Sequence, residues 1–277
     1  MASFNNQNLQ SRSFQGQLLN GADFSGSDIR GCNFRNAQLV EANFERVKAG
    51  LSPQKFMRLS GVMSAIALLV GDALSRLIFG ALGQIPGSSA WSFVLVLYGV
   101  LSAVAVSSGI SSLNGIPPTI RKIARTFSAV LSGALLGFFY AGSASGNNST
   151  LEIAGAIAAS LLMFFASIFL SQAWVKLTIL TIATVTIYSA AFLLGATASI
   201  HLSAQQIGMG TMMAIASLLC VWLTLNSLKQ ILRSLKLLST TSFNGANLLT
   251  ARFDRAELHH KDFSQTKIGR ASCRERV

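Results

Sequence analysis

The sequence predicts a membrane α-helical bundle of about six transmembrane helices, combined with a small repeat module built from both ends of the chain. Three observations predict this fold class. The 277-residue chain is 51% hydrophobic and 12% charged, with a mean hydropathy of +0.51, which is too apolar for an ordinary soluble domain. Six apolar stretches are near or above the length that crosses a bilayer. A large apolar residue also recurs at every fifth position near both ends of the chain.

The N-terminal segment 1–48 keeps a five-residue period, which is neither the helical period of 3.6 nor the strand period of 2. The residue two places before each large residue is often small, and the residue just before it is usually polar, so the unit reads A-(D/N)-(L/F)-x-x. Nine consecutive large residues keep the period: Phe4, Leu9, Phe14, Leu19, Phe24, Ile29, Phe34, Leu39 and Phe44. The segment 241–267 resumes it with Phe243, Leu248, Phe253, Leu258 and Phe263.

This unit resembles the pentapeptide-repeat family, which implies a right-handed quadrilateral β-helix with one pentapeptide on each face and about four in each coil. Large residues then fill the axis, small residues fit where the backbone turns, and neighbouring coils must stack because one repeat cannot bury its inward face alone. The first coil is expected to fray, because polar side chains in the small position cannot all be buried unpaired. These residues are Gln7, Arg12 and Gln17.

Between the repeat segments the pattern changes to long apolar stretches. They cover approximately 59–82, 91–113, 123–142, 151–171, 175–199 and 206–227. Lys and Arg occur before the first stretch, after the last one, and in every second connector. Under the positive-inside rule, this predicts six crossings with both termini, and so both repeat segments, in the cytoplasm.

The predicted domains follow from these patterns. They are repeat segments 1–48 and 241–267, a linker 49–58, a six-helix membrane domain 59–228 whose short internal recurrences favour three hairpins, and a basic amphipathic helix 229–240. We expect the repeat segments to stack as one β-helix that the membrane domain splits, because five pentapeptides alone have too small a core. Two independent stubs, or a longer C-terminal β-helix, are the alternatives.

The last ten residues, 268–277, read IGRASCRERV and resemble translated sequencing-adapter read-through. On that expectation the chain is truncated after Lys267, and the tail is left out of the fold prediction.

Two groups of charged residues are candidate sites. Asp72 and Arg76 lie four residues apart inside the first apolar stretch, where ionisable residues often mark a conduction path. A local ion pair, or an arginine that reaches toward an interface, is the alternative. Lys229, Arg233 and Lys236 lie opposite a leucine-rich face, so the helix 229–240 is expected either to lie on anionic membrane lipids or to serve as an amphipathic connector.

No sequence motif predicts a catalytic, cofactor or metal site; the adjacent His259 and His260 lack companion ligands. Residues 1–48 hold four acidic and five basic residues, which disfavours an acidic DNA mimic, and we expect no nucleic-acid partner. The first functional hypothesis is a non-enzymatic membrane scaffold that docks an unknown cytoplasmic protein. A transporter or channel component is the second, and a lipid-modifying enzyme is a weaker third. The combination of repeats and membrane helices resembles cyanobacterial proteins, which implies a bacterial inner membrane or a thylakoid.

Overall fold

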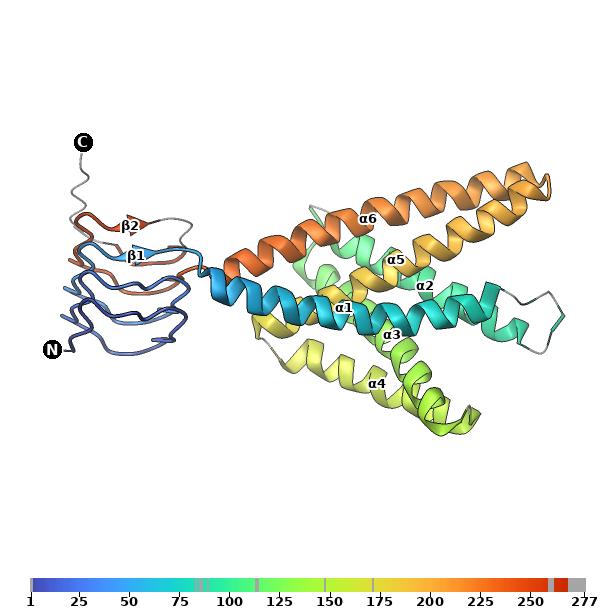
Figure 1. The fold of residues 1–277 in the computed structure, drawn as a ribbon, viewed down its shortest axis with the longest axis horizontal. Coiled ribbons are helices and arrows are strands. Elements are labelled where there is room, and N and C mark those ends of the chain that lie inside the picture. The colour runs from blue at the N-terminus through green and yellow to red at the C-terminus, as the bar shows by residue number, and fades with distance from the viewer. Residues whose placement is uncertain are drawn as a thin grey trace. The chain divides into compact units, whose positions relative to one another are not determined.

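The computed structural model describes residues 2–82, 84, 87–88, 90–112, 115–146, 148–170, 172–258 and 262–268. The chain forms two compact units. The repeat unit combines Met1–Gly61 with Arg233–Val277, and the helical unit is Val62–Leu232. Both repeat segments therefore belong to one unit, although the whole helical unit separates them in sequence (Figure 1).

Within the described residues, six long helices follow one another between the repeat segments. They are α1 (Pro53–Leu82), α2 (Trp91–Ser112), α3 (Pro118–Ser145), α4 (Ser149–Phe169), α5 (Ala173–Ser203) and α6 (Ile207–Ser239). All six are long and apolar enough to cross a membrane, which indicates an integral membrane protein. The predicted bundle of six long apolar helices is confirmed.

The helix ends differ from the predicted domain boundaries. Helix α1 begins at Pro53, inside the expected linker 49–58, with proline in the first helical position where its missing N–H costs nothing. Helix α6 runs without a break to Ser239, so residues 229–239 of the expected separate helix 229–240 are its last part. Hydropathy marks where a helix leaves an apolar medium, whereas the backbone hydrogen bonds continue for as long as the chain stays helical.

Helix α5 lies at the centre of the helical unit, and most residues of its most apolar part are buried. Its buried threonines Thr181, Thr184 and Thr186 each donate a hydrogen bond to the carbonyl four residues earlier in the same helix. Each hydroxyl is therefore satisfied within α5, as an apolar surrounding demands. The surrounding core joins side chains of α1, α2, α3 and α5, among them Leu74, Leu101, Leu135 and Ile182.

Helices α3 and α4 pack through small residues. A Cβ placed at Gly137 would collide with the carbonyl oxygen of Gly155, and one at Gly133 would lie 3.0 Å from the carbonyl oxygen of Ala159. The spacing of Gly133 and Gly137, and of Gly155 and Ala159, places small residues four apart along each helix, which lets two helices approach closely in lipid.

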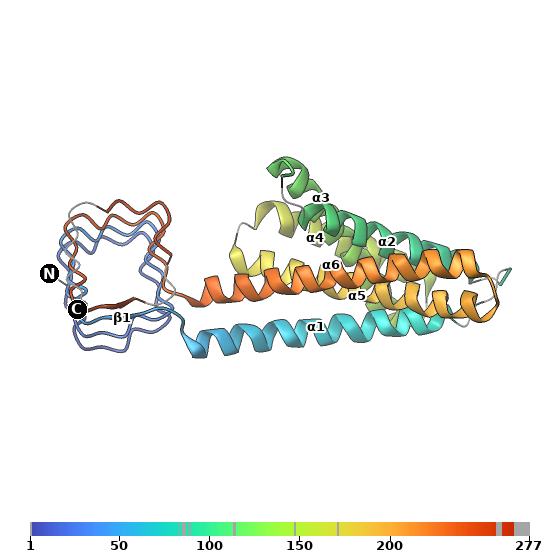
Figure 2. The same ribbon diagram turned by 90° about the horizontal axis from the view of Figure 1, so that it is seen from above.

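The repeat unit is a stack of coils with a square outline (Figure 2). Parallel bridges join residues twenty apart, beginning with Ser3 to Asp23 and Asn8 to Asp28. The same ladder continues onto the C-terminal segment, where Gln38 pairs with Asn247, 209 residues further along the chain. The strands β1 (Lys48–Ala49) and β2 (Glu257–Leu258) belong to this ladder and are parallel. The two repeat segments therefore form one stack.

The glycine contacts of α3 and α4 generate a prediction. Gly137→Ala should lower the thermal unfolding midpoint in detergent, because the new methyl group forces the two helices apart at a cost of about 1–3 kcal/mol. Gly99→Ala in α2 is the matched control, since nothing lies within 4 Å of its Cβ position. It should leave the midpoint unchanged or raise it slightly. Equal midpoints for the two variants would contradict the close packing of α3 and α4.

Candidate functional site: the coils and their junction with the helices

The chain turns at the second residue after each large residue. At these corners the backbone N–H of the residue three places after the large residue donates to the carbonyl of the large residue. Ala22, for example, donates to Leu19 at 3.1 Å. The corner residue has a positive φ in every described corner of the regular repeats, a conformation that favours glycine and asparagine. The non-glycine corners are Asn6, Ser11, Asn36, Glu41, Arg46, Thr250, Arg255 and Gln265.

The polar residue before each large residue stabilises the same turn. The side-chain oxygens of Asp23, Asp28 and Asn43 each accept a hydrogen bond from the backbone N–H two residues later, at 3.0 to 3.1 Å. Asp and Asn favour this local bond because their short side chains reach their own backbone. The polar position of the A-(D/N)-(L/F)-x-x pattern therefore has a physical cause in the turn that follows it.

The large residues form columns inside the stack. Phe24 stacks on Phe44 with ring centroids 5.0 Å apart, and Phe44 stacks on Phe253 of the C-terminal segment at 4.9 Å. The spacing is thus the same within one segment and across the sequence gap. Most of the predicted core residues are buried: Leu9, Phe14, Leu19, Phe24, Ile29, Phe34, Leu39, Phe44, Phe243, Leu248 and Phe253. Those at the ends are half-buried: Phe4, Leu258 and Phe263.

The first coil is paired rather than frayed. Its residues Ser3, Asn8 and Ser13 bridge the second coil in register, and its polar residues in the small position are exposed to solvent. In the second coil the same position is buried and holds small residues: Ala22, Ser27, Cys32 and Ala37. The expectation of fraying was wrong because a terminal coil does not have to bury the residues at its open edge.

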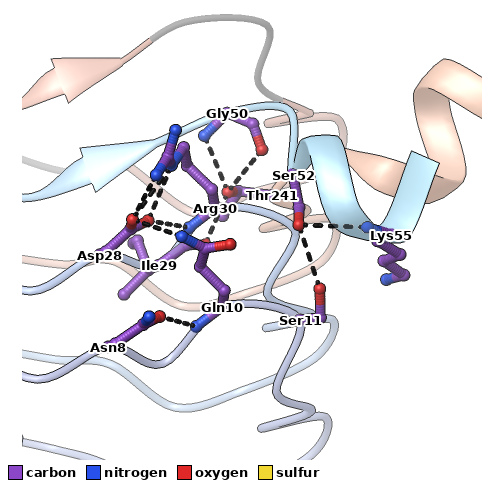
Figure 3. Close-up of polar contacts among 10 residues, drawn as sticks. All are labelled: Asn8, Gln10, Ser11, Asp28, Ile29, Arg30, Gly50, Ser52, Lys55 and Thr241. Carbon is purple, nitrogen blue, oxygen red and sulfur yellow. Dashed lines mark hydrogen bonds and ion pairs between the residues drawn. The ribbon is translucent and has the colours of Figure 1, made fainter. Parts of the chain in front are cut away.

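The helices leave and rejoin the coils at one junction (Figure 3). The incoming and outgoing chains pair there, because Leu51 and Thr240 form an antiparallel bridge. The buried hydroxyl of Thr241 donates to the carbonyl of Ile29 at 2.9 Å and accepts the N–H of Gly50 at 3.0 Å. Thr241 therefore ties the returning chain both to the second coil and to the departing chain.

Gly31 is the point of closest approach at the junction. Its N–H donates to the carbonyl of Gly50 at 3.0 Å, and its own carbonyl accepts from Nζ of Lys55 at 3.1 Å. A Cβ at Gly31 would lie 2.8 Å from Cβ of Ser52 and 3.1 Å from the carbonyl oxygen of Ser239. The start of α1 and the end of α6 thus both rest against one backbone corner of the second coil.

An ion pair lies beside the junction. Burial of the Asp28 carboxyl acts to raise its pKa, but hydrogen bonds from Arg30 and Gln10 outweigh this, so its pKa is lowered. A guanidinium nitrogen of Arg30 lies 2.6 Å from Oδ2 of Asp28, and Nε2 of Gln10 donates to the same oxygen at 2.7 Å. Because the folded-state pKa is the lower one, this stabilisation is present above the ordinary pKa of about 3.9 and is lost as pH falls through the lowered value.

The outward apolar residues gather on one side of the stack. Leu18, Val40 and Leu249 belong to three successive coils, linked by the bridges of Leu18 to Gln38 and Gln38 to Asn247. Leu18 is 81% exposed and Leu249 is 41% exposed. We call these three residues the apolar side.

The predicted pair in α1 is placed on the outside of its helix. Nε of Arg76 lies 3.1 Å from Oδ2 of Asp72, and both side chains are more than half exposed. The neighbouring residues Ala73, Leu74, Leu77 and Ile78 of α1 are the buried ones. The pair therefore faces away from the core of the helical unit rather than into it.

The predicted basic residues at the end of the membrane domain all lie on α6. Lys229, Arg233 and Lys236 are exposed, whereas Ile231 and Leu235 on the opposite face are buried. The cations and the buried Ile231 and Leu235 thus lie on different sides of one continuous helix, whereas Leu228 and Leu232 of the leucine-rich face are exposed.

Two features of the sequence fall outside the described residues. These are His259 and His260, and the tail from residue 269 onward. Within the described ranges, no three His, Cys, Asp or Glu side chains gather as metal ligands would.

Comparison with known proteins agrees with the coil geometry. Residues 13–46 match the family described as pentapeptide repeats, in eight copies. No curated protein and no solved structure matches the chain. The fold and the match together define an integral membrane protein with a pentapeptide-repeat segment.

The junction residues were not recognised from the sequence. Thr241 carries a usable signal, because it holds the small position two residues before Phe243 and so continues the five-residue unit. Gly31 and Ser52 lie next to each other through the same twenty-residue register that pairs Asp28 with Lys48, but no local pattern indicates that Ser239 approaches Gly31 as well.

The junction generates a second prediction. Gly31→Ala should destabilise the repeat unit more than Gly16→Ala, because both corners have φ near +70° but only Gly31 has neighbours within 4 Å. The shared backbone strain costs about 1–2 kcal/mol in each variant, and the displaced junction adds to it in Gly31→Ala alone. Protease resistance of the coils in the full-length protein measures the difference. Equal losses would show that the junction is not tightly packed.

Proposed function

We propose that this protein is a non-enzymatic integral membrane protein whose repeat segments form a right-handed quadrilateral β-helix that serves as a protein-docking scaffold. The apolar side carries this proposal. Leu18 and Leu249 expose 81% and 41% of their surface in outward positions of a hydrogen-bonded stack, and a partner can bury this surface. The twenty-residue register and the stacked phenylalanine columns support the β-helix.

The stack suits docking because its outer surface is held rigidly. Each described coil is joined to its neighbour by backbone hydrogen bonds, so side chains such as Val40 and Leu249 keep a fixed spacing. Rigid presentation lowers the entropy that a partner loses on binding. The apolar side has amide neighbours, Asn20, Gln38 and Asn247, and favours an uncharged protein surface over nucleic acid.

The docking proposal predicts the effect of charge on the apolar side. Leu18→Glu with Leu249→Glu should abolish crosslinking of the full-length protein to its partner in native membranes. Ser13→Glu with Gln265→Glu is the matched control, because it adds the same charge at exposed positions elsewhere on the coils. The control should keep the crosslink. If both double variants keep it, or both lose it, the apolar side is not the docking surface.

We further propose that both termini lie in the cytoplasm, in a bacterial inner membrane or a thylakoid. The alternation of basic connectors supports this orientation. It predicts that a cysteine at Asn148, in the connector between α3 and α4, reacts with an impermeant maleimide added outside the cell. A cysteine at Gln172, between α4 and α5, should react only after the membrane is opened. The reverse pattern would invert the topology.

The transport alternative has less support from the geometry. It requires Asp72 to face a hydrated path with partners from other helices. The carboxylate instead pairs with Arg76 of its own helix, and both groups are exposed on the outer face of α1. An i, i+4 pair of this kind neutralises itself without a path.

A further inference from the structure

Helix α6 carries one continuous exposed stripe that changes in character along its length. Its positions are spaced three or four residues apart, which places them on one face of the helix. The first three are apolar and are 69%, 55% and 53% exposed: Leu218, Trp222 and Leu225. The next three are exposed cations: Lys229, Arg233 and Lys236.

The change from apolar to cationic falls where a bilayer boundary would be. With 33 residues, α6 is about 50 Å long, whereas the hydrocarbon core of a bilayer is about 30 Å thick. The helix must therefore extend out of the core. The apolar part of the stripe suits lipid chains, tryptophan is favoured near the interface, and Lys229 is the first residue of the stripe that demands a polar medium.

Helix α1 has a related arrangement at its start. Its exposed stripe runs from the cation Arg58 through the small or apolar residues Val62, Ala65 and Leu69, and then reaches the self-neutralised pair of Asp72 and Arg76. The bridge between Leu51 and Thr240 ties the two helices together at their base. Arg58 lies seven residues after Leu51, and Arg233 lies seven residues before Thr240. The two cations therefore lie the same number of residues from the bridge.

The cations have no acidic neighbours in sequence. No Asp or Glu occurs from Val47 to Gly71, or from Ile153 to Phe253. The ion pairs formed within the described residues involve other cations: Arg30, Arg46, Arg76 and Arg252. The charge at the base of α1 and α6 is thus left for an external anion.

We propose that Arg58, Lys229, Arg233 and Lys236 bind the headgroups of anionic phospholipids and hold the helices at a defined depth in the bilayer. Basic residues near an anionic membrane surface each add to its attraction, so four of them on two joined helices give a preference over zwitterionic lipid. The proposal does not depend on protein docking by the coils, and its test is separate.

Trp222 provides the probe, because it lies on the stripe seven residues before Lys229. Full-length protein carrying Trp91→Phe and Trp174→Phe is reconstituted into mixed vesicles of phosphatidylcholine and phosphatidylglycerol. In one set the phosphatidylglycerol has brominated acyl chains, and in the other the phosphatidylcholine has them. Bromine quenches tryptophan on contact, so the ratio of quenching reports which lipid lies beside the stripe.

The parent should be quenched preferentially by brominated phosphatidylglycerol, by about fivefold in relative affinity. Lys229→Gln with Arg233→Gln and Lys236→Gln should bring the ratio close to one. Arg12→Gln with Arg35→Gln and Arg255→Gln removes the same charge from exposed positions on the coils and should leave the preference intact. The proposal is overturned if Trp222 is not quenched, if the parent shows no preference, or if both triple variants behave alike.

Discussion

The backbone hydrogen bonds between successive coils are the interaction on which the rest of the repeat unit depends. They hold residues twenty apart in register within the N-terminal segment, and they continue with the same geometry between residues 209 apart. Because the register is kept, Phe44 stacks on Phe253 as closely as it does on Phe24. The buried columns of large residues, the turns at the corners and the alignment of outward side chains all follow from this twenty-residue register.

The same constraint governs how the helices are attached. For the coils to continue in register, the chain must return to the point that it left, and Leu51 and Thr240 meet there as a bridged pair. Thr241 then holds the small inward position. Its hydroxyl bonds to Ile29 and Gly50 and so links the returning chain to the coil that the helices interrupt. An inserted bundle can satisfy this only if its first and last helices end side by side, which an even number of crossings allows.

Helices α1 and α6 must satisfy two requirements, because their apolar parts suit lipid and their ends are held by the coils. Within lipid, their side chains must be apolar or locally satisfied, as the threonines of α5 are. Beyond their apolar stretches, the same helices carry cations and continue until the junction ends them. This is why hydropathy placed the end of the last crossing near residue 227, while the helix itself ends at Ser239. The first coil shows a related effect, because Gln7 and Arg12 break the repeat pattern only where the stack has an open edge.

The sequence by itself determined the local structure. The five-residue period specifies a corner every five residues, the Asp and Asn residues stabilise the turns, and the six apolar stretches specify six long helices. These features depend on neighbours in the chain, so their signals are local. Only the tertiary structure decided that Gln38 pairs with Asn247, that Gly31 receives both helix ends, and that Asp72 and Arg76 face outward. Such contacts join segments far apart in sequence, and they are selected by the packing of the whole unit rather than by any local pattern.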